Sequence, residues 1–260
     1  MKLMVNHQTH YSYTADVVSS IQYIKMMPTN NAHQQVHHWN ISIPGEKQVN
    51  KDAFNNLWMV STQREPYQNL TIMAQGVIEL NPLLSDQGLQ DKLNPNLFLQ
   101  PTISTLCSAE MKDFATRHVP VLSRLNLMYL AQAILNHVEY VPNSSSVHGS
   151  AMDAFHDRKG VCQDHSHILI AMCKYLGLPA RYISGYLFAQ NSSHLASHAW
   201  VEIYIDQAWY CFDVSNQLFT PSAHIYVAVG RDYWDVAPVR GVREKGGVES
   251  MHSIVQVLSC

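Results

Sequence analysis

Apolar and polar side chains alternate with a period of two residues over several short stretches of the first 80 residues. These stretches are rich in β-branched and aromatic side chains and cover residues 11–13, 21–24, 36–43, 54–61 and 70–80. Turn-forming residues interrupt them at Pro28-Thr29-Asn30-Asn31 and Pro44-Gly45. Because short, regularly spaced strands are typical of a sandwich, the pattern predicts an N-terminal antiparallel β-sandwich over residues 1–95.

Residues 81–101 separate this region from one with a different pattern. They contain Pro82, Pro95 and Pro101 together with several amides, a composition typical of a linker. Apolar residues at helical spacing then predict helices over residues 105–118, 124–140 and 150–156, and a further helix that starts at Cys162.

After the Cys162 helix the apolar period returns to two residues. Strands are predicted over residues 181–188, 197–205 and 209–212, with two more over residues 225–229 and 254–258. A polar loop over residues 189–196 leads into the second strand, and the glycine-rich, charged residues 241–247 are predicted to form an exposed loop. Helices on one side of an antiparallel sheet make an α+β domain, here residues 96–260.

Composition narrows the class of protein. Of the 260 residues 14% are charged, and the formal net charge of −3 argues against a nucleic-acid partner held by phosphate contacts. The five cysteines are an odd, widely spaced set, which favours free thiols in a reducing compartment. We find neither a signal peptide nor an apolar run of ~20 residues, so a cytoplasmic protein with no membrane partner is predicted.

Cys162 is the first candidate for chemistry. It follows the flexible Gly160 and opens a helix whose apolar residues recur at three- and four-residue spacing. A thiol at a helix N-terminus meets unpaired backbone N–H groups and the positive end of the helix dipole, which favour the thiolate. Most cysteines are only small buried hydrophobes, so position alone is weak evidence of a nucleophile.

His198 and Asp213 supply possible partners for that thiol. If Asp206-Gln207 forms a two-residue hairpin turn, Trp200 pairs with Asp213, and His198 lies diagonally across from Asp213 on the same face. A three-residue turn would place the two on opposite faces. A carboxylate can hold an imidazole that takes a proton from a thiol, so Cys162, His198 and Asp213 form a candidate catalytic triad.

Other side chains near these positions are weaker candidates. His165 lies three residues after Cys162 and ranks second to His198 as the base, because it lacks a partner as well placed as Asp213. Asp164 is a candidate for stabilising the helix dipole, and, with His165 and His167, for lining the site.

The remaining polar and thiol residues favour structural interpretations. Asn216 is a candidate for orienting a side chain, although asparagine after a strand usually belongs to a turn. Cys173 and Cys211 are predicted to be buried and inert, and Cys107 and Cys260 are not assigned a role. The fifteen histidines show no zinc-site spacing, so no metal and no cofactor is expected.

Several motifs, in order along the chain, resemble those of the bacterial transglutaminase-like proteins. They are Gly160-Val161-Cys162-Gln163-Asp164, Leu178-Pro179-Ala180-Arg181-Tyr182, Ser197-His198-Ala199-Trp200-Val201-Glu202, Phe212-Asp213 and Val227-Ala228-Val229-Gly230-Arg231-Asp232-Tyr233. The resemblance is strong from about residue 120 to 258, and the N-terminal part shares only the general character. One departure is Val214-Ser215 where that family usually has proline and threonine, which changes the turn after the strand.

This resemblance implies a papain-like core in which Cys162 is the nucleophile, His198 the base and Asp213 the orienting carboxylate. It implies a thiol acyl-transfer enzyme, here expected to hydrolyse a peptide or amide bond of a peptide or protein substrate, as a cysteine protease. Amine-dependent crosslinking proceeds through the same thioester, so it remains an alternative, as does a non-catalytic binding module on the same fold. Because the chain lacks an Asp-x-Asp-x-Asp-Gly calcium loop, we favour hydrolysis. The backbone N–H of Cys162 is the first oxyanion donor; the second donor, the substrate preference and the oligomeric state are left open.

Overall fold

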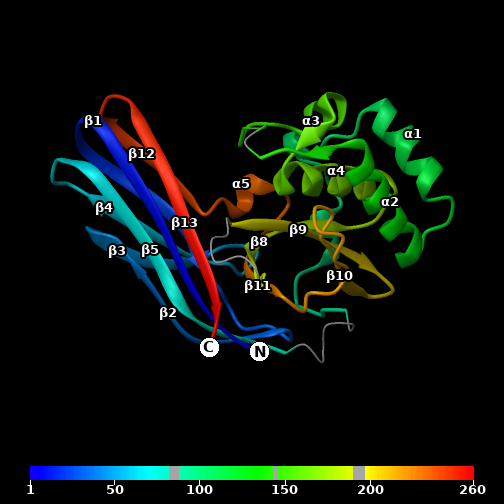
Figure 1. Cartoon of the computed structure of the whole chain (residues 1–260), viewed down its shortest axis with the longest axis horizontal. Coiled ribbons are helices and arrows are strands. Elements are labelled where there is room, and N and C mark those ends of the chain that lie inside the picture. The colour runs from blue at the N-terminus through cyan, green and yellow to red at the C-terminus, as the bar shows by residue number, and fades with distance from the viewer. Residues whose placement is uncertain (82–87, 143, 145, 190–196) are drawn as a thin grey trace.

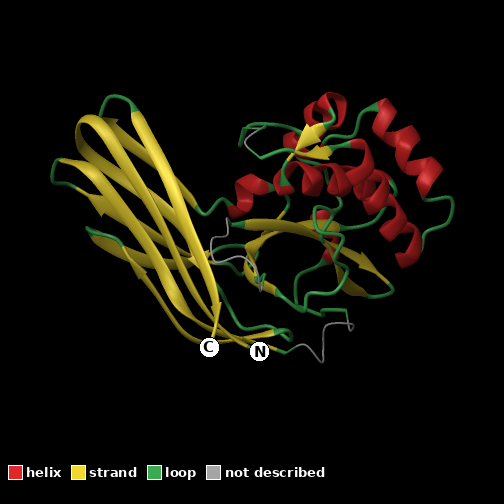
Figure 2. Cartoon of the chain, viewed as in Figure 1, coloured by secondary structure: helices red, strands yellow, loops and turns green. Residues whose placement is uncertain are grey.

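The computed structural model of the chain describes residues 1–81, 88–142, 144, 146–189 and 197–260. Figure 1 shows two bodies side by side, a curled sheet and a group of helices packed against a second sheet. The helices lie together on one side of that second sheet (Figure 2). This arrangement confirms the predicted α+β class, with an N-terminal part built of antiparallel strands.

One long strand, β1 (Lys2–Met27), organises the first sheet. Its first half pairs with β5 (Tyr67–Leu80) and its second half with β4 (Leu57–Gln63). β2 (Gln34–Ser42) and β3 (Glu46–Lys51) then extend the sheet beyond β5 and β4. The register along β1 shifts between Ser12 and Val17, and such irregularities bend a strand and increase its twist. A single sheet therefore curls where the sequence predicts a sandwich.

Two C-terminal strands complete this sheet, and they correct part of the predicted domain division. β12 (Val239–Lys245) and β13 (Glu249–Ser259) both run antiparallel to β1, although the prediction places them with residues 96–260. The predicted loop over residues 241–247 is also wrong, because the chain leaves the sheet only around Gly246 and Gly247, both with positive φ. Alternation shows which face a side chain takes, but not which strand lies beside it.

The second sheet has the order β10-β9-β8-β11, and all its pairs are antiparallel. Its strands are β8 (Ala180–Leu187), β9 (His198–Ile205), β10 (Ala208–Phe212) and β11 (His224–Gly230). The predicted loop at residues 189–196 lies, apart from Ala189, outside the described residues.

Helices cover one face of this sheet. They are α1 (Ala109–His118), α2 (Arg124–His137), α3 (Ala151–Asp157), α4 (Cys162–Tyr175) and the short α5 (Tyr233–Val236). Every residue of α4 from Asp164 to Lys174 is buried, since α4 packs between the sheet and the other helices. A helix that is buried all round forms a fixed support for the residue at its start.

A shared core joins the two bodies. Leu3 and Val5 of β1 pack with Tyr186 of β8 and Ile225 of β11, and all four side chains are at most 2% exposed. Polar contacts reinforce this core, because the Gln34 side chain bonds both the N–H and the C=O of Tyr226 at 2.8 Å. The curled sheet is therefore packed directly onto the second sheet.

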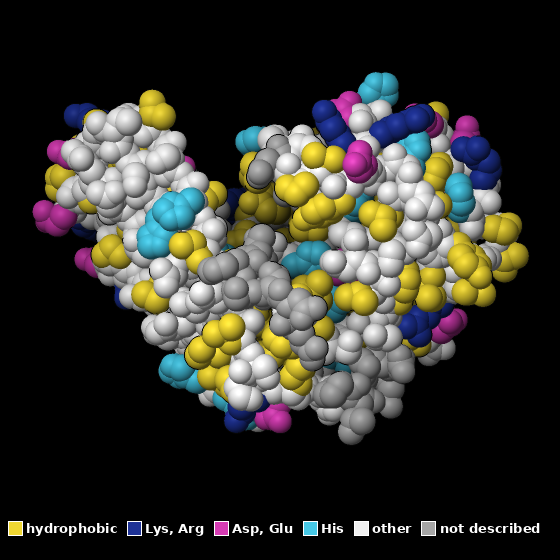
Figure 3. Space-filling view, in the orientation of Figure 1, with side chains coloured by type: hydrophobic (Ala, Val, Ile, Leu, Met, Phe, Trp, Pro, Cys, Tyr) yellow, Lys and Arg dark blue, Asp and Glu magenta, His cyan; other side chains and the backbone are white. Residues whose placement is uncertain are grey.

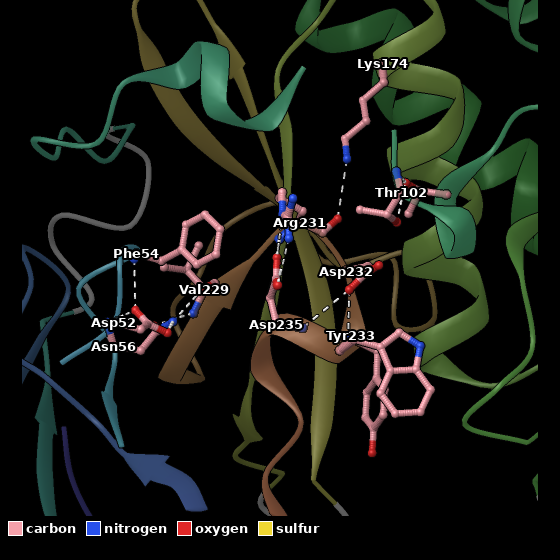
Figure 4. A network of polar contacts seen from close by, with 12 residues as sticks. Asp52, Phe54, Asn56, Thr102, Lys174, Val229, Arg231, Asp232, Tyr233 and Asp235 are labelled. Carbon is pink, nitrogen blue, oxygen red and sulfur yellow. Dashed lines mark hydrogen bonds and ion pairs between the residues drawn. The ribbon is translucent and has the colours of Figure 1, made fainter. Parts of the chain in front are cut away.

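The segment from Gly230 to Val236 adds a second connection, drawn in Figure 4. Arg231 forms an ion pair with Asp235, and Asp232 accepts the N–H groups of Trp234 and Asp235 at the start of α5. Lys25 of β1 donates to the C=O of Asp235 at 2.6 Å. The segment from Gly230 to Val236 thus forms the turn through which the chain returns from β11 to the first sheet.

The predicted linker is anchored to the second body at a few points of its described part, although most of its residues there are exposed. Leu89 forms a bridge with Trp209 of β10, and a 3₁₀ helix over Pro95–Phe98 buries Phe98 completely. Asp91 forms an ion pair with the buried Arg181. Among the described residues, no helix has both the length and the apolar character required to span a bilayer.

Candidate active site

Cys162 is the first residue of α4, as predicted, and its side chain is partly exposed. It is held there by a short parallel pairing of β6 (Glu139–Tyr140) with β7 (Lys159–Gly160). A Cβ atom on Gly160 would lie 2.7 Å from the Cβ of Asp164, so only glycine fits at that position. The buried Asp164 carboxylate accepts the N–H of Val161 at 2.8 Å, which stabilises the start of the helix.

The hairpin of β9 and β10 has the predicted register. Asp206 and Gln207 form the two-residue turn with φ of 50° and 63°, as a type I′ turn requires. Ile205 faces Ala208 and Val201 faces Phe212, which is the register that a two-residue turn predicts. His198 Nε2 lies 2.7 Å from Asp213 Oδ2.

Asp213 is fully buried and accepts hydrogen bonds from three side chains on one oxygen. Besides His198, its Oδ2 atom accepts from Asn216 Nδ2 at 2.9 Å and from His224 Nε2 at 3.1 Å. The backbone N–H of Asn216 donates to the other oxygen at 3.2 Å. Burial raises the pKa of Asp213, but the hydrogen bonds from His198 and His224 and the electrostatic attraction to these rings outweigh burial and lower it far below its usual range.

His198 lies between the carboxylate and the thiol. Burial lowers its pKa, but the hydrogen bonds to Asp213 and Cys162 and the charges of both partners raise it to about 10. An ionised carboxylate only accepts, so the Nε2 atom of His198 carries the hydrogen and its Nδ1 atom is left for a proton from the thiol. The three predicted residues are therefore brought into one cluster.

The second-ranked base has a different role in the structure. His165 is buried, with its Nδ1 atom 2.8 Å from Ser215 Oγ and its Nε2 atom 2.9 Å from the C=O of Val138. Burial lowers its pKa despite the bond to Val138. His167 is also buried and accepts the N–H of Tyr233 at 3.2 Å. Both ring nitrogens of His165 and the Nε2 atom of His167 are thus engaged in contacts that support the fold around α4.

The other thiols differ from Cys162. All five cysteines are free, and Cys173 and Cys211 are buried as predicted. Burial raises the pKa of Cys107 to about 11 and raises those of Cys173 and Cys211 as well. Because a thiolate is the reactive form, none of these three matches the setting of Cys162 beside an imidazole.

Sequence reasoning did not identify His224. It is the first residue of β11, is fully buried, and shares the Asp213 oxygen with His198. The ring of Trp200 packs on both histidines, with centroids 5.9 Å from His198 and 4.8 Å from His224. A histidine at the start of an otherwise apolar strand was the only signal in the sequence.

His198, Asp213 and His224 also place potential metal-ligand atoms within 4.8 Å of one another. In the described part of the chain, this is the one group of three His, Cys, Asp or Glu side chains with that spacing. The Nε2 atoms of both histidines hydrogen-bond to Asp213 Oδ2, so these three atoms already have partners within the chain.

The surface is hollowed where the curled sheet meets the second body, and hydrophobic and histidine side chains are visible there (Figure 3). The His198 side chain is 12% exposed, whereas those of Asp213 and His224 are fully buried. His198 is thus accessible to solvent, whereas Asp213 and His224 are shielded from it.

Comparison with known protein families gives two matches along the chain. Residues 3–79 match the bacterial transglutaminase-like N-terminal region, and residues 123–214 match the transglutaminase-like superfamily core. The second segment contains Cys162, His198 and Asp213.

Individual relatives can be aligned with this chain over nearly its whole length. The chain is 28% identical to an uncharacterized protein of Mycobacterium leprae, covering 98% of each. It is 25% identical to an uncharacterized protein of Mycobacterium bovis over 92% of this chain and 86% of that one. A crystal structure of a provisionally assigned cysteine protease from Cytophaga hutchinsonii shares the fold, with a TM-score of 0.79, 22% identity, and coverage of 100% and 91%.

Proposed function

Because the chain belongs to the transglutaminase-like superfamily, we propose that it is a thiol acyl-transfer enzyme that hydrolyses a peptide or amide bond. The observation that carries this proposal is the position of His198, which bonds Asp213 through Nε2 and has Cys162 as its other partner. A base held between a carboxylate and a thiol is the arrangement that activates a nucleophile.

The proposed reaction has two halves. His198 takes the proton of Cys162, and the thiolate attacks the substrate carbonyl carbon. The imidazolium then gives that proton to the leaving amine, and a thioester remains on Cys162. In the second half His198 takes a proton from water, the hydroxide attacks the thioester, and the acid product and free thiol are released. The backbone N–H of Cys162 at the start of α4 supports the oxyanion in both halves.

Hydrolysis is favoured over amine transfer by the exposure of the site. Cys162 and His198 are both partly exposed, so water can reach the thioester. We also propose that the substrate is a peptide or protein. The cytoplasmic location stays a prediction from the cysteine content.

Product analysis tests the proposal. The protein is incubated with short peptide amides and an active ester, with and without a primary amine, and the products are identified by mass. We expect the free acid to form in both conditions, with little amine adduct, and expect Cys162→Ala to form neither product. Adducts that dominate at millimolar amine would favour crosslinking, and binding without turnover would favour a non-catalytic module.

A further inference from the structure

His224 is the buried polar group that the proposed reaction leaves unused. It opens β11, its side chain has no exposed surface, and its Nε2 atom lies 3.1 Å from Asp213 Oδ2. The same oxygen lies 2.7 Å from His198 Nε2. Two imidazoles therefore compete for one carboxylate oxygen, and only one of them contacts the thiol.

The protonation of His224 follows from its partners. An ionised carboxylate only accepts, so His224 carries its hydrogen on Nε2. Its Nδ1 atom is buried and has no hydrogen-bond partner among the described residues, so a proton added there would have no acceptor. Burial lowers the pKa of His224 and outweighs the opposing pull of Asp213 and Glu202, while the charge of His198 lowers it further. The ring is therefore neutral at pH 7.

Neutrality decides what the second imidazole can do. A charged His224 would form an ion pair with Asp213, so the carboxylate would stabilise the imidazolium of His198 less. A neutral donor instead stabilises the carboxylate without cancelling its charge. Trp200, which is fully buried, packs on both rings and keeps them in this arrangement.

We propose that His224 is a positioning residue, a neutral second donor that keeps Asp213 ionised, aims it at His198, and limits how tightly it holds the proton of His198. This inference deepens the proposed function, since it rests on that function in treating His198 as the base. A proton that is held too tightly on His198 passes slowly to the leaving amine. The hydrogen bond from His224 therefore adjusts the proton affinity of His198 as well as the orientation of Asp213.

Two substitutions at position 224 separate this role from simple packing. His224→Phe fills the space but removes the donor, whereas His224→Gln keeps a neutral N–H donor. The imidazole resonances of His198 are titrated by NMR in both variants and in the parent protein, and melting temperatures and acylation rates are recorded alongside.

The Phe variant should raise the titration midpoint of His198 by on the order of one pH unit, a tenfold change in proton affinity. It should slow acylation by about 10–100-fold, by analogy with the loss of a side chain that orients a metal-ligating histidine. The Gln variant should restore both values toward those of the parent.

Three results would overturn the proposal. The first is an unchanged His198 midpoint in a His224→Phe protein that melts normally. The second is a His224→Gln variant that behaves like His224→Phe. The third is a parent protein in which His224 itself is protonated at pH 7; this measurement decides the matter even if both variants unfold. If the His198 midpoint shifts as expected but the parent protein does not acylate at all, the positioning role of His224 stands and the proposed enzymatic function is wrong.

Discussion

His198 and Asp213 meet across the open end of a hairpin, with Nε2 and Oδ2 2.7 Å apart. They are 15 residues apart in the chain, and the two-residue turn at Asp206 and Gln207 sets their register. An insertion of one residue in that turn would move Asp213 to the other face of the hairpin. The geometry of the proposed site therefore depends on a turn at the far end of the same hairpin.

Substitution of Asp213 tests its role in orienting His198. Asp213→Asn keeps the size and one acceptor oxygen but removes the charge that supports the imidazolium. We expect acylation of an active ester to fall by about two to three orders of magnitude, less than in a serine triad because a thiol ionises more easily. The variant should stay folded, with a melting temperature lowered by a few degrees, because Asp213 also stabilises the charged ring of His198.

Asp206→Asn is the matched control for this variant. Asp206 lies in the turn of the same hairpin, is exposed, and has a φ of 50° that asparagine tolerates. It should acylate at the parental rate. An Asp213→Asn protein that melts normally and also acylates at the parental rate would remove Asp213 from the site.

The raised pKa of His198 predicts how stability depends on pH. Since that pKa is raised from 6.5 to about 10 in the folded protein, the charged ring stabilises the fold fully below pH 6.5 and loses this contribution as pH rises through 10. Asp213 behaves oppositely, because its pKa is lowered and its contribution is lost only in strong acid.

His198→Gln should isolate this effect in thermal melts from pH 6 to pH 10.5. We expect the parent to melt higher than the variant at pH 6 by roughly 2–4 °C, which about 1 kcal/mol produces in a chain of this size. The difference should shrink as the pH approaches 10.5. A difference that is constant across this range would show that the ring's charge contributes nothing to folding.

The hairpin register, the start of α4 and the α+β class all followed from local patterns. Turn chemistry at Asp206-Gln207 determines which residues face each other, and Gly160 before an apolar helix marks where Cys162 lies. These features depend on residues that are close together in the chain, so they can be predicted from local sequence patterns.

The partners of β12 and β13 did not follow from local patterns. Both strands pair with β1, more than 200 residues earlier in the chain, and an alternating strand fits equally well at several sheet edges. His224 was missed for a related reason, because its contact with Asp213 joins β11 to the residue after β10, and these strands lie at opposite ends of the sheet order.

These long-range pairings predict the outcome of limited proteolysis. We expect a protease such as proteinase K to cut first between Leu80 and Thr105, because residues 81–101 have the composition of a linker. We expect the two fragments to stay together afterwards, because β12 and β13 pair with β1 and the two bodies share the core around Leu3 and Ile225. Gel filtration in buffer and in 6 M urea distinguishes the outcomes: fragments that separate in plain buffer would show that the bodies are independent.

Thiol reactivity provides a separate test of the nucleophile. With iodoacetamide at pH 7, peptide mapping should find Cys162 labelled before Cys107, Cys173 and Cys211, whose pKa values are raised by burial. Cys260 is exposed and serves as the reference for an ordinary surface thiol. Cys162 should also lose its advantage in His198→Ala. Slow labelling of Cys162 relative to Cys260 would contradict a thiol activated by an imidazole.

The central claim is that Cys162 carries the acyl group, and trapping that intermediate tests it most directly. The parent protein and Cys162→Ala are mixed with an active ester at low temperature, quenched in acid within seconds, and measured by intact mass and peptide mapping. We predict one acyl group per chain, on Cys162, which hydroxylamine removes as expected of a thioester, and none on the variant. Acylation at another residue, or equal labelling of the parent and Cys162→Ala, would contradict the account.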